Sequence, residues 1–478
     1  MPKIQNSFLR GKMNKDLDER LVPKGEYREA QNILITQSES SDVGAIENIE
    51  GNALAVPMPT ITGNLETIGY FADTLNKKAY WFITDFTGDD GDVRTMSRAQ
   101  SSNTCQILMA DLNNTSEEAK IIVQGHFLNF SKNHLITGVN LIDDLLFFTD
   151  NYNQPRKINV TRAEADNTYY TKEEQISVAK VVPYLAPILH NSSGQGDNTT
   201  ITNNSDITSD YLKDRFVRFS YRYKYEDGEY TTMAPFTQIV FKPLNEGNID
   251  NILTTSREET DVQDVYSKTI VDIMKNHYNQ VEVRIPLPGD EYQTDSSIDW
   301  NNELRITKLE ILVKESDQDV VKVVKEIDVN DNNSFTSLLE TRPIVYGTTS
   351  TTYYRHVYKY VYKSEEPYKI LEDKQITRVF DQVPLRAKSQ EISGNRVIYG
   401  NFTENYELPT DSNGKSGINY VINSTSKGDT AISSIFNNNP QYNKAVYKNH
   451  SVKQKRKYQV GVVLIDKFGR QSPVILST

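Results

Sequence analysis

Residue types that can do chemistry are common in this chain, but few of them have the spacing of a reactive site. The densest acidic group is Asp85-Phe-Thr-Gly-Asp89-Asp90-Gly91-Asp92. Its oxygen atoms are of the kind that Ca²⁺ prefers, but it lacks the Glu that closes an EF-hand loop at position twelve. Asp and Gly are also ordinary turn residues. A solvated hairpin turn is the favoured interpretation, and bound Ca²⁺ is left open.

Other catalytic signatures fail on spacing. Gly414-Lys415-Ser416 resembles the end of a phosphate-binding loop, but Pro409 occupies the position where that motif needs its first glycine. Cys105 has no His near it in sequence, the six His show no metal-ligand spacing, and no Gly-x-Ser-x-Gly turn is present. Paired carboxylates for glycoside hydrolysis stay open, because their separation in space is not visible in a sequence. The prediction is a protein that is not an enzyme and has no cofactor, catalytic residue or metal ligand.

Charge gives a further bound on function. Lys and Arg total 53 against 64 Asp and Glu, a net charge of −11, which argues against a protein that grips nucleic acid. One basic run, Lys453-Gln-Lys455-Arg456-Lys457, could touch phosphates or an acidic subunit, although a solvated start to the following strand is the simpler interpretation. No apolar run reaches the ~18–20 residues of a membrane helix, and the first residues lack the apolar stretch of a secretory signal. We expect a soluble protein without a membrane anchor, made in a reducing cytoplasm.

The elements that must position these residues are mainly strands. The chain has 28 Tyr, 17 Phe and 2 Trp, more aromatic residues than a disordered chain carries. Short runs rich in Val, Ile, Tyr, Phe and Thr are separated by Gly, Asn, Asp and Pro. The clearest predicted strands are 79–84, 145–149, 216–223, 280–285, 309–313 and 458–465. Helical spacing is confined to Val262–His277 and a short stretch at Lys15–Leu21.

Two kinds of repeat indicate the architecture. Strand-and-acidic-turn units occur at Ala79–Asp85, Leu145–Val160 and Asn395–Tyr406, and they are typical of propeller blades. Longer hairpins at Phe216–Phe241 and Lys457–Leu476 enter their second strand through a Pro, as in immunoglobulin and fibronectin type III sandwiches. We therefore predict an all-β fold: a β-propeller body with inserted β-sandwich modules and few helices.

The predicted domain boundaries follow from these repeats. Residues 1–60 are a docking segment with the first strands, 61–189 the first propeller blades, and 190–345 an inserted sandwich module with one helix. Residues 346–410 are further blades, and 411–478 are a polar loop and a second sandwich module. The stretches 190–210 and 411–442 are so polar that exposed loops are expected.

The segment from Gly11 to Asn32 combines charged, leucine and turn-forming residues more densely than any other part of the chain. Leu17 and Leu21 share one side of a predicted helical turn, Asp16 lies four residues before Arg20, and Pro23-Lys-Gly25 forces a turn. We predict that this segment docks on a neighbouring subunit or adaptor. The competing interpretation is that it closes its own propeller by pairing with a C-terminal strand. The predicted interface residues are Met13, Asn14, Asp16, Leu17, Asp18, Glu19, Arg20, Leu21, Pro23, Gly25, Glu26, Tyr27 and Arg28.

This segment resembles the opening of the tail-tube tip proteins of short-tailed phages, called nozzle, muzzle or tail tubular protein B. The resemblance lies at Met13–Pro23, Gly25–Arg28, Val43–Ala45 and Gly51-Asn52. It continues at Thr377–Ala387, Gln390-Glu391, Asn395–Phe402 and Asp466–Pro473. It is closest in style to the muzzle proteins of crAss-like gut phages. Because relatives often run longer, a processed or partly truncated product is expected.

The resemblance implies a structural virion protein of a bacteriophage tail, assembled in the host cytoplasm. It would form a homo-oligomeric, six-fold ring at the distal end of the tail tube, next to portal-proximal adaptor proteins and with tail fibres or receptor-binding proteins as further partners. The ring would retain genomic DNA and then conduct it during ejection without specific binding. The ring's copy number, neighbours and trigger are not set by the sequence. The alternative is a glycan-binding propeller or sandwich protein with weak polysaccharide depolymerase activity, whereas a bacterial adhesin is disfavoured by the missing signal.

Overall fold

The computed structural model of this chain describes most of its 478 residues. The described residues are 12–35, 46–48, 54–61, 63–88, 97–190, 212, 215–240, 280–288, 304–316, 318–331, 337–346, 349–363, 367–406, 420–422 and 455–476. The chain divides into two compact units, one made of Met1–Pro59 with Ala110–Ala119 and the other of Thr60–Met109 with Lys120–Thr478.

The first unit contains two small pairs of strands. Strands β1 (Lys12–Met13) and β2 (Glu26–Tyr27) pair in parallel, and strands β3 (Ile33–Ile35) and β4 (Ile46–Asn48) pair antiparallel. Parallel strands need a connection that returns to the same end. Residues 14–25 supply it here as a loop without regular structure.

The second unit begins with two sheets that share a core. One has the order β5 (Glu66–Asp73), β6 (Lys78–Thr84), β7 (Cys105–Asp111), β8 (Lys120–Gln124), and the other has the order β11 (Arg156–Asn159), β10 (Leu145–Thr149), β9 (Gly138–Ile142). Phe82 of β6 and Phe148 of β10 meet with Phe130 from the segment between β8 and β9, and the Phe82 and Phe148 ring centres are 5.1 Å apart. The 3-10 turn η1 (His126–Leu128) and helices α1 (Val160–Ala165) and α2 (Glu173–Ile176) contribute Leu128, Ala163 and Ile176 to the same core.

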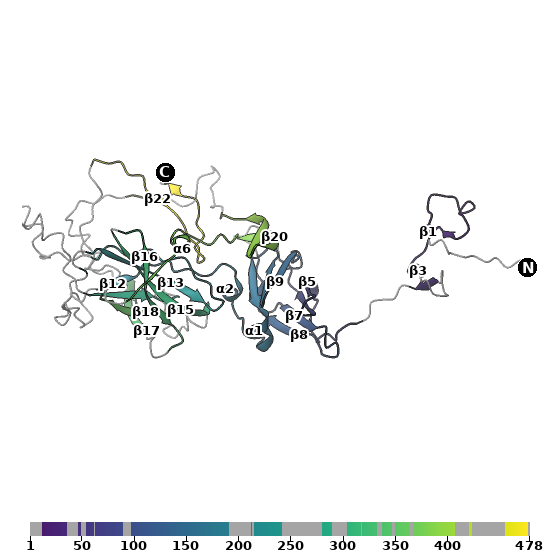
Figure 1. Cartoon of the computed structure of the whole chain (residues 1–478), viewed down its shortest axis with the longest axis horizontal. Coiled ribbons are helices and arrows are strands. Elements are labelled where there is room, and N and C mark those ends of the chain that lie inside the picture. Colours follow the sequence, from purple (N-terminus) through teal and green to yellow (C-terminus); the bar gives the residue numbers. More distant parts are fainter. Residues whose placement is uncertain are drawn as a thin grey trace, which may run out of the picture. The chain divides into compact units, whose positions relative to one another are not determined.

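A distant hairpin lies against the second of these sheets. It consists of β20 (Arg386–Ser393) and β21 (Arg396–Thr403), and β20 lies against β9 and β10 (Figure 1). The Ala387 carbonyl accepts from the Asn151 amide at 2.9 Å and from the Thr149 hydroxyl at 2.6 Å. More than two hundred residues of chain therefore separate two neighbouring parts of one structure.

Between these parts of the chain come two four-stranded antiparallel sheets. One has the order β12 (Ile188–His190), β14 (Val281–Pro286), β18 (Thr349–Tyr362), β17 (Ser337–Tyr346), and the other has the order β13 (Val217–Tyr225), β15 (Ile306–Glu315), β16 (Val321–Asp328), β19 (Lys369–Ile370). Both sheets contribute to one core cluster, for example Val283 and Tyr360 from the first and Phe219 and Ile311 from the second. The chain ends with helix α6 (Asp373–Ile376), the β20–β21 hairpin and the short strands β22 (Gly461–Val462) and β23 (Ile475–Leu476).

The predicted β-rich character is confirmed. The described residues form mainly strands with three short α-helices. Of the six clearest predicted strands, 79–84, 145–149 and 309–313 lie within observed ones, and 216–223 and 280–285 begin one residue before β13 and β14. The sixth, 458–465, is wrong in extent, because only Gly461–Val462 pairs as a strand. The sheets are small and open, so the propeller and the sandwich modules stay predictions. No helix among the described residues is long and apolar enough to cross a membrane.

Some predicted elements lie outside the described residues. These are the helix Val262–His277, almost all of the polar stretches 190–210 and 411–442, and Asp89–Asp92. The helix predicted at Lys15–Leu21 is wrong, since this stretch forms only bends and a turn. The Asp18 side chain accepts from the Arg20 amide at 3.0 Å, and such a local bond competes with a helix for the backbone.

Candidate functional site

The segment from Lys12 to Arg28, called here the N-terminal loop, is closed by its own two ends. Strand β1 pairs with β2, and the Asn14 amide donates to the Tyr27 carbonyl at 2.8 Å. The Asn14 side chain also donates to the Glu26 carboxylate at 3.1 Å. Among the described residues, β1 and β2 pair with each other and not with a C-terminal strand. Self-closure makes the loop a small independent structure.

Two turns shape the interior of the N-terminal loop. Leu21 bonds back to the Asp18 carbonyl at 2.8 Å, and Glu26 bonds back to the Pro23 carbonyl at 3.1 Å. Gly25 has φ of 94°, a left-handed conformation that favours glycine. The ion pair of this loop joins Arg28 to Glu19 at 3.3 Å, not Asp16 to Arg20 as the spacing predicts.

The loop exposes three apolar side chains. Met13 is 48% exposed, Leu17 37% and Leu21 67%. Single exposed apolar residues are ordinary, but three within nine residues of a self-closed loop form a small exposed apolar patch. The structure thus brings Asn14, Glu26 and Tyr27 together, and Glu19 with Arg28, while the three apolar side chains face solvent.

The other candidate groups prove to be structural. The Asp85 carboxylate accepts from the Thr104 amide at 2.8 Å, so this part of the acidic run caps a neighbouring segment. Cys105 is buried beside Thr84, and burial raises the pKa of its thiol, which keeps it protonated and unreactive. No group of three His, Cys, Asp or Glu able to hold a metal ion occurs in the part of the chain that the structure describes. Gly414–Ser416 and Lys453 lie outside that part, while Lys455–Lys457 are exposed.

One pocket of about 260 Å³ lies between residues 380–383, 404–405 and 470–473. Its lining includes two carboxylates, Asp381 and Glu404, and one aromatic ring, Phe380. Burial raises the pKa of Asp381, but Arg378 bonds to the same carboxylate at 2.7 Å and opposes the shift. A carboxylate held by an arginine with a single aromatic neighbour does not form the platform that a sugar-cleaving site uses. The glycan alternative therefore gains no support from this pocket.

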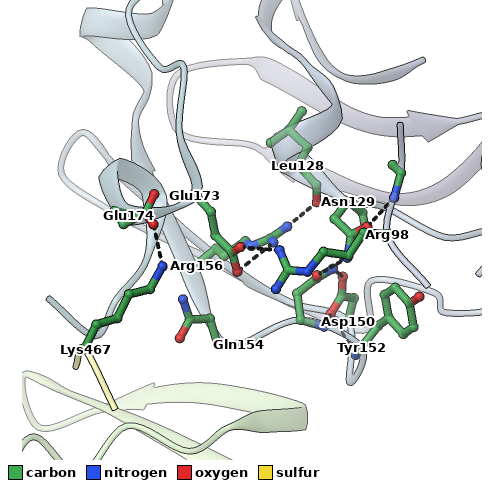
Figure 2. Close-up of polar contacts among 12 residues, drawn as sticks. Arg98, Leu128, Asn129, Asp150, Tyr152, Gln154, Arg156, Glu173, Glu174 and Lys467 are labelled. Atoms are coloured by element: carbon green, nitrogen blue, oxygen red, sulfur yellow. Dashed lines mark hydrogen bonds and ion pairs between the residues drawn. The ribbon is translucent and has the colours of Figure 1, made fainter. Parts of the chain in front are cut away.

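A buried polar network ties the C-terminal turn to the first two sheets (Figure 2). At its centre Arg156, only 1% exposed, donates to the Leu128 carbonyl and lies 3.5 Å from the Glu173 carboxylate. Arg98 holds the other oxygen of Glu173 at 2.7 Å. Burial raises the pKa of Glu173, but these two arginines outweigh it and the net shift is downward. The adjacent Glu174 pairs with Lys467, which belongs to the C-terminal turn.

A second, partly buried cluster of charged groups joins strand β11 to the turn after β13. Lys157, 2% exposed, lies 3.0 Å from Asp227 and 2.8 Å from Glu229. Arg162 adds contacts to Asp227 at 2.8 Å and to Glu226 at 3.3 Å. Burial raises the pKa of Asp227, but the cations around it lower it overall. We call these groups, together with Lys180, the junction cluster. Sequence reasoning identified the Asp227-Gly228-Glu229 turn but not its partners, because nothing local signals a pairing across 70 residues.

Lys180 makes the stability of the junction cluster depend on pH. Burial lowers its pKa to about 8, against the attraction of Glu229, Asp227 and Glu226, and with the repulsion of Lys157. From pH 8 to 10 the unfolded chain keeps a proton that the folded chain has released, so stability rises with pH. Relative to Lys180→Met, the wild-type free energy of unfolding should rise by about 1 kcal/mol per pH unit in this window. Urea unfolding at several pH values measures it.

The comparison with Lys180→Met is needed because other groups also make stability depend on pH in this range. The pKa of Cys105 and that of Tyr225, which faces Lys180, are both raised by burial, and both lower stability as pH rises past their unfolded values. These contributions are common to both proteins and cancel in the difference. Parallel stability curves for the two proteins from pH 8 to 10 would show that Lys180 keeps its ordinary pKa.

A family model described as Crassvirus muzzle protein matches residues 3–285, more than half of the chain. The matched range includes the N-terminal loop, the first two sheets and the junction cluster, and it ends within strand β14. No curated protein matches the chain.

Proposed function

The chain belongs to the Crassvirus muzzle protein family, and on that premise we propose that it forms the distal ring of a phage tail tube. The match over residues 3–285 carries this proposal and confirms the resemblance seen at Met13–Pro23. Membership of the family gives a structural role in a phage tail and a place in the virion. The ring would retain packaged DNA and conduct it during ejection, a mechanical role without catalysis.

The net charge of −11 supports passage of DNA through such a ring. Each lysine or arginine that neutralises a phosphate adds to the affinity for a duplex, so a basic lumen would slow transit. Carboxylates repel the duplex within about a Debye length of roughly 8–10 Å. We propose that the loops facing the channel carry the acidic excess, and a lumen that is basic along its whole length contradicts this.

The proposed architecture is a blade-forming body, residues 61–189 and 346–410, split by a sandwich module at 190–345 and followed by a second one at 411–478. Support for the split body comes from the β20–β21 hairpin, which packs on β9 and β10. Support for the inserted module comes from the shared core of the two four-stranded sheets, which also take in β18 and β19 from beyond residue 345. The proposed partners are further copies of this chain, the portal-proximal adaptor proteins, and tail fibres or receptor-binding proteins.

The experiment that tests the proposed ring uses the purified full chain. Mass measurement and negative-stain imaging at micromolar concentration, with and without isolated adaptor complexes, should show closed rings with a central channel. A six-fold ring is the expected form. A chain that stays monomeric under all of these conditions, or open filaments without closure, contradicts the proposal.

The N-terminal loop is proposed as the docking element of this ring. Arg20→Glu and Leu21→Asp change exposed side chains, since only the Arg20 amide and the Leu21 amide bond within the loop. We expect both variants to fold with unchanged thermal midpoints but to assemble at least tenfold more weakly, about 1.4 kcal/mol. The measurement is assembly followed by mass photometry.

The control variant reverses a charge in the same way but at a position outside the N-terminal loop. Lys77→Glu alters an exposed residue in the turn between β5 and β6, outside the N-terminal loop, and should assemble like the wild type. If Arg20→Glu and Leu21→Asp unfold instead, the loop closes its own subunit, as the competing interpretation holds.

A further inference from the structure

The C-terminal residues 460–476, called here the ribbon, have a firmly held base. The Arg470 side chain is 7% exposed and donates to the Pro384 carbonyl at 3.3 Å and to the Gln154 side chain at 3.2 Å. The Val182 amide donates to the Lys467 carbonyl at 3.1 Å. Asp466 accepts from Arg470 at 2.7 Å within the same turn. The turn at residues 466–470 is therefore an integral part of the second unit.

Both arms that leave this base expose apolar side chains. Val463, Leu464 and Ile465 are consecutive and 37%, 43% and 55% exposed, and Val474 and Leu476 on the other arm are 61% and 50% exposed. Successive residues of a strand point to opposite faces, and Ile475, between Val474 and Leu476, is only 4% exposed, so the second arm presents one exposed apolar face. An isolated two-stranded hairpin is marginally stable in water. A near-continuous apolar run of this kind is typical of a strand buried on both sides.

A second incomplete surface lies on strand β21. Among the described residues β21 pairs only with β20, which leaves its other edge open. Ile398 and Phe402 lie four residues apart on one face of this strand and are 53% and 51% exposed. An open edge with apolar side chains is a template for the addition of another strand.

We propose that the ribbon of one copy of this chain packs on the β21 edge of the next copy. The proposal rests on the proposed ring and names its subunit contact. The same chain carries both a ribbon with exposed apolar side chains and an apolar strand edge without a neighbour among the described residues, so one copy supplies what the next lacks. Contact between two different surfaces of identical chains is head-to-tail, and it closes into a ring when the rotation allows. Strand addition of this type is a recurring mode of recognition.

Cysteine pairs test this contact directly. Val474→Cys and Leu476→Cys mark the ribbon, and Ile398→Cys and Phe402→Cys mark the edge. The single native thiol, Cys105, is 1% exposed and does not compete for a cross-linker. Mixing a ribbon variant with an edge variant and adding a short bis-maleimide should give a linked dimer on a denaturing gel. Each variant alone should stay monomeric on that gel, and a chain with both substitutions should give a ladder.

The outcomes separate this inference from the proposed function. Rings by mass measurement with no ribbon-to-edge linking, or with linking of ribbon to ribbon alone, overturn the contact and leave the ring intact. Absence of any oligomer for the unmodified chain overturns the ring itself. Linking only in the mixture supports the contact, because an intramolecular link cannot arise between two singly substituted chains.

A charge placed on the ribbon gives an independent readout. Leu464→Asp should weaken assembly at least tenfold while leaving the thermal midpoint unchanged, because the side chain is already exposed in the single chain. The matched control is Leu75→Asp, at an 89% exposed leucine in the turn between β5 and β6, which should assemble normally. Equal assembly of the two variants contradicts the proposed contact.

Discussion

Arg222→Met should lower the free energy of unfolding by about 3–5 kcal/mol, the usual cost of removing one member of a buried ion pair. Arg222 on β13 lies directly opposite Glu310 on β15, and its Nε is 2.6 Å from the Glu310 carboxylate. Their side chains are 5% and 1% exposed. The variant leaves a buried carboxylate without its cation, and one oxygen of Glu310 already has no hydrogen-bond partner. Urea unfolding measures the loss.

The reverse change, Glu310→Met, should cost less. Arg222 would keep its bond to Gln375 and its position over the Tyr230 ring, 4.1 Å from the ring centre. The double variant Arg222→Met with Glu310→Met should recover to within about 1–2 kcal/mol of the wild type, because no buried charge remains. Strictly additive costs in this cycle would show that the two side chains act independently.

The matched control lies in the same sheet. Lys308 and Glu326 pair between β15 and β16, but both side chains are more than a third exposed. Lys308→Met should change stability by less than about 1 kcal/mol, because solvent screens an exposed pair. The contrast between Arg222→Met and Lys308→Met isolates the effect of burial from that of strand position.

Local signals predicted the strands and their acidic turns. The strand at residues 145–149 and the turn that follows it need only neighbouring residues, since the Asp150 carboxylate accepts from the amides of Tyr152 at 2.9 Å and Asn153 at 2.7 Å. A short apolar run and a capping Asp are both visible within a short window. This is why the blade-like units were found in the sequence and match observed strands.

The segment after β13 shows where such signals fail. The hairpin pattern predicts a second strand through Phe241, but residues 231–240 form no regular strand. The amides of Thr231, Ala234 and Thr237 bond to Tyr223, Tyr221 and Phe219, so three residues on one side match two on the other. The Thr231 and Thr237 hydroxyls accept from the Tyr223 and Phe219 amides at 3.0 Å and replace missing ladder bonds. Side chains that substitute for backbone partners are not visible in a hydrophobic pattern.

The two candidate surfaces, the N-terminal loop and the ribbon, also differ in whether local sequence predicts them. The N-terminal loop was predicted because its unusual residues are contiguous. The ribbon was identified only as a hairpin, since its exposure depends on what the rest of the chain leaves uncovered. Arg470 lies 316 residues from Gln154, and no spacing rule connects two such positions. Long-range contacts of this kind come from the fold, not from the sequence pattern.

Lys157→Met should lower the free energy of unfolding by about 1–3 kcal/mol, because it removes a buried cation, 2% exposed, that the partly buried Asp227 and the 38% exposed Glu229 share. Asp227 keeps Arg162 as a partner, but Glu229 loses its 2.8 Å contact and has another oxygen with no bond. The matched control is Lys78→Met, whose pair with Glu164 is partly exposed and should contribute less than about 1 kcal/mol. Since Lys157 belongs to β11 and its partners follow β13, the loss should also speed proteolytic cleavage near residues 225–229. Urea unfolding and timed proteolysis of both variants provide the test, and equal behaviour of Lys157→Met and Lys78→Met would show that the junction cluster does not hold these two parts of the chain together.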